Sequence, residues 1–356
     1  MASIFAETLR ALAPLFFLMV LGTALRRSGM LRAEHVPVLN GIVVNVTLPA
    51  LVVHSLATAP NVPRETLWLP LVILIGELAV MAIALGIARA TRSTRSRAGA
   101  LMLVGAFGNT GFLGYPITLA LFPHQFTAAI LVDQVGMGIA LFVSAPILGA
   151  LLAPATLPAP QTELEAAASP GVGSQSTPST LPEPPDHLPA TPRQQALRNI
   201  VAFFRSPLFI AMTLGIVIRL ISWPQAFVHN IQDNGVGDVV AHCLTYLGQG
   251  TVPLIMLSMG AALRPQAARV GAAPLLTASV LKLAVLPLIM WQLLRLLGVH
   301  GDILTVGVML AAMPTAVMAS VLSTHNGFDS DYSVGTVFVT TVLSAATLPL
   351  WIMIAR

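Results

Sequence analysis

Three ionisable side chains lie deep within apolar stretches of this sequence. Glu77 lies in "LVILIGELAVMAIAL", Lys282 lies in "LTASVLKLAVLPLIM", and Asp133 lies within a further apolar run. A charge at the centre of a bilayer costs about 2.5 to 3.5 kcal/mol on insertion scales, so each group should be paired, neutral or in contact with water. Two interpretations stay open: an ion pair between Glu77 and Lys282, or proton and charge coupling by all three residues.

A second unusual stretch, "VGAFGNTGFLGYPIT" at residues 104 to 118, interrupts an apolar run. Close helix packing would explain its glycines, but it explains neither Asn109 nor Pro116, which removes an intrahelical hydrogen bond. We expect the helix to unwind around residues 108 to 113, with Pro116 in the first turn of the half-helix that follows. Pro314, in "LAAMPTAVMAS", should open a second half-helix in the same way.

Two half-helix N-termini that face each other carry free N–H groups and partial positive charge, which suits a small anion. The opposing C-terminal ends suit a cation, so the sign of the ligand stays open, with the anion favoured. The Asn109 amide could donate to a substrate oxygen, or it could only cap a half-helix. The predicted substrate-binding residues are Gly108, Asn109, Thr110, Gly111, Pro116, Pro314 and Thr315.

The elements that must position these residues are membrane-spanning helices. Of 356 residues, 56% are hydrophobic and 9% are charged, a composition that excludes an ordinary soluble domain. Apolar runs recur at the length of roughly 20 residues that a helix needs to cross about 30 Å of hydrocarbon, and the first lacks the features of a cleaved signal peptide. We predict ten spans, at residues 4–25, 35–56, 67–88, 98–122, 126–152, 207–222, 236–262, 272–296, 303–325 and 331–354.

The arginines orient these spans. If the loops alternate sides, one side collects twelve arginines and the other collects five, so the positive-inside rule places both termini outside the cytoplasm. The arginine-rich side holds Arg26, Arg27, Arg32, Arg89, Arg92, Arg95, Arg97, Arg193, Arg198, Arg205, Arg264 and Arg269.

A Pro-rich linker, residues 153–197, separates two sets of five spans, residues 1–152 and 198–356. Its composition predicts a disordered cytoplasmic segment, serving as a spacer or as a regulatory region. Pro49 and Pro253 are 204 positions apart, and Glu77 and Lys282 are 205 apart. Two halves with an odd number of spans form an inverted repeat, as in many secondary transporters. Asn45, Pro49 and Pro253 are the expected helix-break or scaffold residues.

Several functional classes find no support in the sequence. Cys243 is the one cysteine, which excludes an intrachain disulfide and a cysteine-based metal cluster. The histidines are too scattered for a metal site, and neither a phosphate-binding loop nor a nucleophile elbow is present. We therefore expect no cofactor, no bound metal, no nucleic-acid partner and no enzymatic activity.

The ordered set of motifs resembles the auxin efflux carrier family, which includes plant PIN carriers and bacterial malonate-transporter-like proteins. The motifs are "NVTLPALV", "GNTGFLGYPI", "VPLIMLSMGAAL", "MPTAVMASVLSTHNGFDSDYS" and "TVLSAATLPLW". The resemblance implies an all-α fold similar to sodium/proton antiporters, in which broken helices 4 and 9 cross at the substrate site. Asn109, Pro116 and Pro314 match the family's crossover residues. Met313 stands where plant carriers place an asparagine, which argues against auxin as the substrate.

The same resemblance implies a scaffold of spans 1, 2, 6 and 7, usually dimeric, and a moving domain of the other six. We therefore expect a homodimeric secondary transporter in the bacterial cytoplasmic (inner) membrane, embedded in the lipid bilayer. It would carry a small organic anion, a carboxylate or dicarboxylate, by elevator-type alternating access, with protons as the candidate coupling ion. A cation/proton exchanger using Asp133 and Glu77, and a membrane receptor for a metabolite, are the alternatives.

Overall fold

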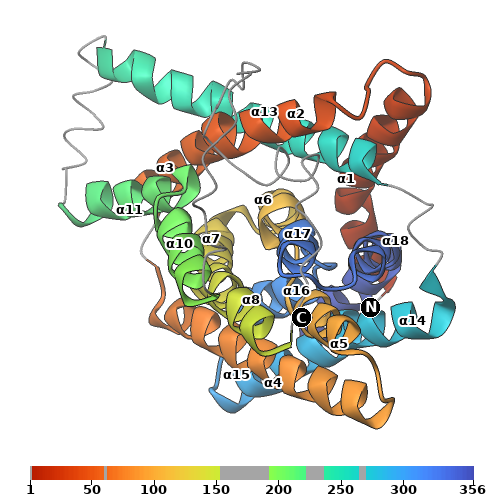
Figure 1. Cartoon of the computed structure of the whole chain (residues 1–356). Helices are drawn as coiled ribbons and strands as arrows, with labels where there is room; N and C mark the ends of the chain where they lie inside the picture. The colour runs from red at the N-terminus through yellow and green to blue at the C-terminus, as the bar shows by residue number, and fades with distance from the viewer. Residues whose placement is uncertain (1, 60–61, 153–191, 222–235, 264–269) are drawn as a thin grey trace.

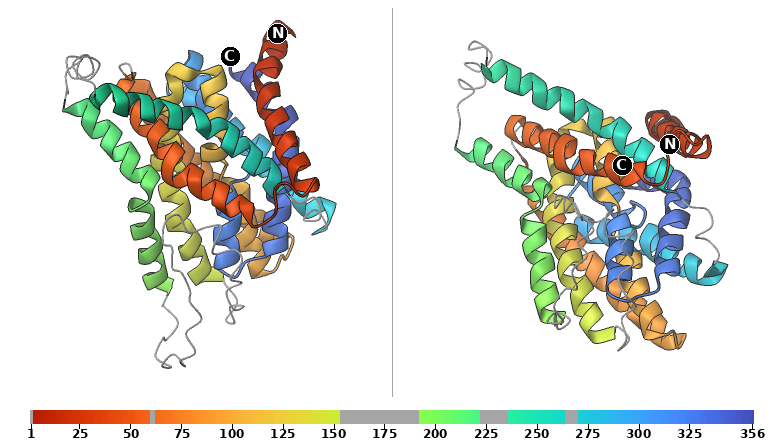
Figure 2. Two further views of the ribbon diagram at one scale, coloured as in Figure 1. Left: turned by 90° about the horizontal axis from the view of Figure 1, so that it is seen from above. Right: turned by 45° about the horizontal axis from the view of Figure 1, so that its top comes forward.

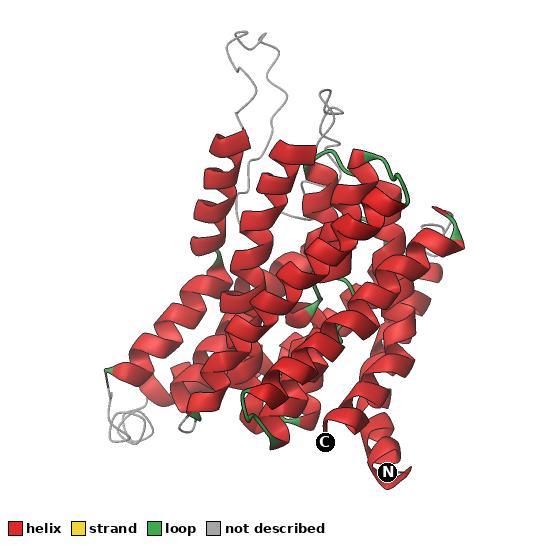
Figure 3. Ribbon diagram, turned by 90° about the horizontal axis from the view of Figure 1, so that it is seen from below, coloured by secondary structure: helices red, strands yellow, loops and turns green. Residues whose placement is uncertain are grey.

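The computed structural model describes residues 2–59, 62–152, 192–221, 236–263 and 270–356. Within these ranges every regular element is a helix, and a single isolated bridge is the one strand-like contact (Figure 3). The fold is therefore all-helical, as the composition indicates. Residues 153–191, most of the expected linker, lie outside the described ranges, and residues 192–197 form the first turns of a helix.

In the first half of the chain, several helices are interrupted by loops or widened by π-turns, near proline and glycine residues. The helices are α1 (Ala2–Arg27), α2 (His35–Ile42), η1 (Val43–Thr47), α3 (Leu48–Thr58), η2 (Arg64–Leu67), α4 (Trp68–Ala90), α5 (Arg95–Ala106), η3 (Thr110–Gly114), α6 (Tyr115–Leu121), η4 (Pro123–Gln125), α7 (Phe126–Leu131), η5 (Val132–Gly138) and α8 (Ile139–Leu152).

The second half repeats the alternation of long helices with broken ones. Its helices are α10 (Pro192–Phe204), α11 (Pro207–Leu220), α13 (Val236–Ala262), α14 (Ala272–Val280), η7 (Leu281–Val285), α15 (Leu286–Leu296), α16 (Gly301–Ala311), α17 (Val317–His325) and α18 (Ser330–Ala355).

Seven continuous helical stretches among the described residues are long and apolar enough to cross a membrane, and an eighth is the bent pair α10 and α11. This pair turns by 48° between Phe204 and Pro207, so the expected sixth span at 207–222 begins earlier, near Leu197. Its residue 222 lies outside the described ranges. The expected fourth and ninth spans each consist of two shorter helices separated by a break.

Two groups of helices surround these breaks. Figure 1 shows α2, α3 and α13 running together across one side, while α5, α16 and α17 lie toward the centre. In both views of Figure 2, α1 crosses α13 near one end, and these helices are in close contact. Large apolar side chains are exposed along the outside, including Phe17, Ile75 and Leu214. Such a surface suits lipid and not water.

The core contains the two helices that lead into the breaks. Every residue of α5 from Ala98 to Ala106 is buried, and so is every residue of α16 from Leu304 to Ala311. Short loop segments consequently lie in the middle of the helical body in Figure 3 and not only at its ends. Backbone without helical hydrogen bonds is tolerated at such depth only if other protein groups or water satisfy it.

Candidate substrate site

The two broken helices cross each other through extended backbone. α5 ends at Ala106 and α16 ends at Ala311. The Asn109 N–H donates to the Pro314 carbonyl at 2.7 Å, and the Ala316 N–H donates to the Phe107 carbonyl at 3.0 Å. Gly108 and Thr315 thereby form an antiparallel bridge. The N–H and C=O groups at one break form hydrogen bonds with those at the other. Both breaks can therefore lie in an apolar interior.

Thr315 connects this crossing to two neighbouring helices through hydrogen bonds. The residue is fully buried. Its N–H donates to Thr340 Oγ1 at 3.1 Å, and its hydroxyl donates to the Val104 carbonyl at 2.8 Å. Its N–H and its hydroxyl are therefore used within the fold, and in this conformation Thr315 holds the crossover together.

Pro116 and Pro314 occupy different positions relative to their half-helices. Pro116 lies inside the half-helix Thr110–Leu121, because α6 continues directly from η3. The helix is interrupted only at residues 107–109, so the expectations that residues 108 to 113 unwind and that Pro116 lies in the first turn of the half-helix are wrong. Pro314 lies within the extended break, three residues before Val317, where α17 begins. The expectation that Pro314 opens the second half-helix is therefore wrong: it interrupts the span, and its carbonyl accepts the bond from Asn109.

Lys282 supports the crossover from one side. Its side chain is fully buried, and Nζ donates to the Ala311 carbonyl at 2.6 Å. Ala311 is the last residue of α16, and a cation is favoured at a helix C-terminus because the helix dipole is negative there. A Cβ atom placed on Gly108 would lie 2.9 Å from both Cε and Nζ of Lys282. Only glycine leaves room for the lysine at this point.

Glu77 lies on α4 and is also fully buried. Both of its carboxylate oxygens lack a hydrogen-bond partner among the described residues. The described ion pairs do not include Glu77 with Lys282, since Lys282 is directed at Ala311 instead. The two charges still lie close enough to interact electrostatically. A direct ion pair, one of the two expected accounts of these residues, is therefore not formed in this structure.

Asp133 is the best-satisfied of the three charged groups. It lies in η5 and accepts hydrogen bonds from the Thr110 hydroxyl, from the Tyr115 hydroxyl at 2.9 Å and from Gln134 Nε2 at 2.6 Å. The backbone N–H of Gly111 faces the same carboxylate. These groups belong to the first turns of η3 and α6, so Asp133 places a resident negative charge at the N-terminus of that half-helix.

Tyr115 and Gln134 were missed by the sequence reasoning. Each is adjacent in the chain to an expected residue, Pro116 or Asp133. Only the π-turns η3 and η5, which widen both helices at this point, direct them toward one carboxylate. The nearest sequence signal was that polar side chains at Tyr115 and Gln134 lie within otherwise apolar runs.

Asn109 begins η3, yet its side chain makes no capping hydrogen bond. Its amide nitrogen lies 3.9 Å from the sulfur of Met259 on α13, a weak contact, and the residue is 5% exposed. The alternative in which Asn109 only caps a half-helix is therefore not what the structure contains. α17 begins at Val317, and its N-cap residue Ala316 makes no side-chain hydrogen bond to the first turn, so the N–H groups of this turn form a second set of donors beside the crossing.

The expected scaffold residues mark irregular helix, although they do not all break it. Asn45 lies in η1, and its amide donates to the Gly41 carbonyl at 2.8 Å. Pro49 follows in the first turn of α3. Pro253 lies inside α13, which is a continuous helix of 27 residues from Val236 to Ala262. α2, η1 and α3 follow one another without a gap from His35 to Thr58, so both prolines lie within continuous helices and neither breaks its span.

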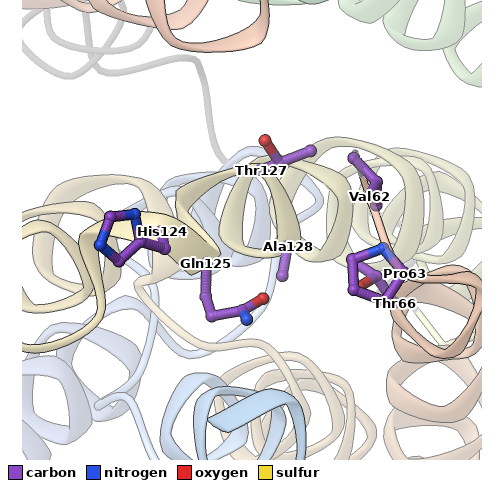
Figure 4. A pocket seen from close by; sticks show the side chains of 7 residues that line it. All are labelled: Val62, Pro63, Thr66, His124, Gln125, Thr127 and Ala128. Atoms are coloured by element: carbon purple, nitrogen blue, oxygen red, sulfur yellow. The ribbon is translucent and has the colours of Figure 1, made fainter. Parts of the chain in front are cut away.

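A small cavity of about 20 Å³ lies elsewhere, between η2 and the start of α7 (Figure 4). The residues that line it are Val62, Pro63, Thr66, His124, Gln125, Thr127 and Ala128. The Thr66 hydroxyl is buried and lacks a partner among the described residues. A space of this size suits an ordered water, and none of its lining residues belongs to the crossover.

An all-helical protein with an apolar surface, whose buried core joins two broken helices beside ionisable residues, is a membrane transporter in architecture. Comparison with known proteins agrees. The chain belongs to the membrane transport protein family, the family of auxin efflux-like carriers, whose profile matches residues 8–352. The resemblance inferred from the crossover motifs is thereby confirmed over nearly the whole chain.

Two archaeal relatives extend this result. The chain is 27% identical over 349 residues to an uncharacterized transporter of Methanothermobacter thermautotrophicus, a match that covers 98% of each chain. It is 26% identical over 326 residues to an uncharacterized transporter of Methanocaldococcus jannaschii, a match that covers 91% of each chain. Both relatives are similar in length and both carry the name of transporters, so a transporter role is supported for the full chain.

Proposed function

We propose that this protein is a secondary transporter that moves a small organic anion, a carboxylate or dicarboxylate, across the cell membrane. The observation that carries the proposal is the donor set at the crossover. The Asn109 amide makes no cap, and the α17 N-terminus has no side-chain cap, while both flank an extended, buried backbone crossing. Uncapped helix N-termini and amide donors stabilise a carboxylate.

The packing of the two halves supports ten spans in an inverted repeat. α1 packs on α13, and α11 packs on α3, so the first helix of each half contacts the second span of the other. Within each half, the third span packs on the fourth: α4 packs on α5 in the first half, and α15 packs on α16 in the second. With the broken segments counted, this arrangement gives five spans in each half, the architecture of many carriers with a binding site near the midplane.

An elevator-type movement follows from the same grouping. Spans 1, 2, 6 and 7 would form the scaffold and a homodimer interface, and the remaining spans would carry the crossover past it. Both termini would lie outside a bacterial cytoplasmic membrane, because the arginine-rich loops then face the cytoplasm. Asp133 and Glu77 are the candidate proton carriers, since each is an acidic group within the apolar region.

Substitution of Asn109 tests the assignment. We expect Asn109→Ala to abolish uptake of labelled monocarboxylates and dicarboxylates into proteoliposomes without loss of folded protein. The matched control is Asn45→Ala, because the Asn45 amide is bonded within its own helix, to Gly41. Wild-type rates in Asn109→Ala would refute a role for this amide in binding. Counterflow of labelled substrate separates transport from the receptor alternative.

A second candidate, a cation/proton exchanger, is favoured by one observation. Glu77 is a fully buried carboxylate whose two oxygens have no partner among the described residues, and such a group can hold a proton or a cation. In this reading Glu77→Gln removes sodium- or potassium-dependent proton movement in proteoliposomes that contain a pH-sensitive dye. Anion uptake would then be absent from the wild-type protein as well.

A further inference from the structure

The span at residues 272–296 contains a carbonyl group whose usual helical partner is missing. α14, η7 and α15 follow one another there without a gap. In a regular α-helix the N–H of residue 287 would donate to the Leu283 carbonyl, four positions earlier. Residue 287 is a proline, which has no N–H. Leu283 is 4% exposed and lies near the middle of the span, where a carbonyl without a donor is costly.

Trp351 supplies a donor to this carbonyl. Its indole Nε1 donates to the Leu283 carbonyl at 2.7 Å, and a tryptophan side chain has no other donor. Trp351 belongs to α18, which lies beside α14 (Figure 1) and contacts η7. The carbonyls four residues before Pro253 and Pro349 receive no side-chain donor among the described hydrogen bonds. The indole is therefore a feature of this turn and not of helix prolines in general.

The same turn carries Lys282. η7 is a π-turn, in which the N–H of Leu286 donates to the Leu281 carbonyl, five positions earlier. A π-turn holds one residue more than an α-turn, and one residue corresponds to about 100° of rotation at 3.6 residues per turn. The turn therefore decides in which direction its side chains point. Lys282 points to the crossover, where Nζ donates to the Ala311 carbonyl at 2.6 Å.

The surroundings of Lys282 make this direction critical. The side chain is fully buried, and the bond to Ala311 is the one hydrogen bond described for its ammonium group. Gly108 leaves just enough room for Cε and Nζ. A change in the π-turn would rotate the ammonium away from the end of α16 and leave a buried charge without its acceptor, which is costly.

We propose that Trp351 is a positioning residue for Lys282. The indole takes the place of the N–H that residue 287 lacks and fixes the π-turn, and the π-turn directs the ammonium to the C-terminal end of α16. Without the indole N–H the Leu283 carbonyl is free, the turn can rearrange, and Lys282 leaves Ala311 for part of the time. This inference does not depend on the nature of the transported substrate.

The test follows Lys282 directly, because it is the one lysine in the sequence. An amine-reactive N-hydroxysuccinimide ester therefore reports on Lys282 and on the N-terminal amine, which mass spectrometry of the purified full chain in detergent separates. Labelling of Lys282 should be slow in the wild-type protein. We expect Trp351→Phe, which keeps an aromatic ring without the N–H, to raise this rate about threefold to tenfold, the scale of one lost hydrogen bond.

Trp351→His separates the hydrogen bond from the packing of the ring. Histidine is smaller than phenylalanine, but two atoms separate its Nε2 from Cβ, as they separate the indole Nε1, so it can donate at the same place. We expect the labelling rate of Lys282 in Trp351→His to be closer to the wild-type rate than in Trp351→Phe. A rate in Trp351→His equal to or above that in Trp351→Phe would overturn the proposal, because ring packing would then explain the effect.

Two controls exclude other causes. Trp291→Phe makes the same substitution on the span that carries Lys282, at an indole without a hydrogen bond among the described residues. Gly260→Ala disturbs the contact of α13 with α1, which does not involve η7. Both variants should keep the wild-type labelling rate well below their melting temperatures.

An unchanged rate in Trp351→Phe, or an equal increase in either control, would contradict the role assigned to the indole. If Trp351→Phe does not fold, Trp351→Tyr, which also lacks the indole N–H, takes its place in the same comparison with Trp351→His.

Discussion

At the scale of single residues, charged groups compensate the ends of broken helices. Lys282 donates to the last carbonyl of α16, and Asp133 accepts hydrogen bonds from the first turns of η3 and α6. Each charge lies where the helix dipole favours its sign. Two of the three intramembrane charges therefore have a structural role in this conformation, and Glu77 is the one whose oxygens have no described partner.

The contact between Gly108 and Lys282 gives a prediction at this scale. Gly108→Ala places a methyl group 2.9 Å from Cε and Nζ of Lys282, which forces the ammonium away from the Ala311 carbonyl. We expect the free energy of unfolding to fall by about 1 to 3 kcal/mol, because a buried charge loses its hydrogen bond and the crossing is overpacked. Transport should fall with it. Thermal unfolding of the purified variant measures the effect.

Gly105→Ala is the control for this prediction. It adds the same methyl group to the same span, but its nearest neighbour is a Leu281 side-chain carbon at 3.4 Å, which can adjust. Equal unfolding temperatures for the two variants would contradict the role assigned to the space beside Lys282.

At the scale of elements, α1 and α13 approach each other closely at two glycines. A Cβ atom on Gly22 would overlap the Leu257 carbonyl, and one on Gly260 would overlap the Met19 carbonyl. The Thr23 hydroxyl donates to the Gly260 carbonyl at 2.8 Å across the same contact. Small residues permit such backbone contact between membrane helices, so this pair forms a tightly joined unit within the proposed scaffold.

Gly260→Ala tests that unit. Its new methyl group meets backbone atoms of α1, which cannot rotate away as a side chain can, so the two helices must separate. We expect a loss of about 1 to 3 kcal/mol in the free energy of unfolding. Gly250→Ala, on the same helix with nothing within 4 Å of the added atom, should be neutral or slightly stabilising. Similar melting temperatures for both variants would contradict the proposed contact.

At the scale of the whole molecule, the proposed elevator movement requires the scaffold to slide past the body that holds the crossover. α10 meets α8 through Phe203, whose ring lies 5.1 Å from that of Phe142 between centroids. Within the proposed moving body, Ser323 of α17 and Ser333 of α18 lie in contact, with their hydroxyl oxygens 2.8 Å apart. In the proposed movement, the Phe142–Phe203 contact would slide, whereas the Ser323–Ser333 contact would stay fixed.

We expect a short bifunctional thiol reagent to stop transport in Phe142→Cys/Phe203→Cys, prepared in a Cys243→Ser background, and reduction to restore it. A disulfide in Ser323→Cys/Ser333→Cys should leave transport close to that of the reduced form, since both residues belong to one rigid body. Undiminished transport by the cross-linked Phe142/Phe203 pair would refute the elevator assignment. Labelled substrate uptake into proteoliposomes gives the rates.

The sequence by itself determined the class of the protein and the position of its breaks. Hydropathy, Pro116 and the glycines near residue 108 act locally, through the cost of exposing backbone in lipid and the loss of single hydrogen bonds. They predicted membrane helices, an interruption near Asn109 and buried charges at Glu77, Asp133 and Lys282. Such patterns are readable because each depends on neighbours a few positions away in the chain.

Only the tertiary structure decided which partner each buried polar group takes. Asn109 pairs with Pro314, Lys282 bonds to Ala311 and not to Glu77, and Tyr115 joins Thr110 at Asp133. Pro49 and Pro253, both expected near helix breaks, each lie within a continuous helix. These outcomes depend on contacts between helices far apart in the sequence, where packing sets which groups lie within hydrogen-bond distance, and residue types and spacings carry no direct record of that choice.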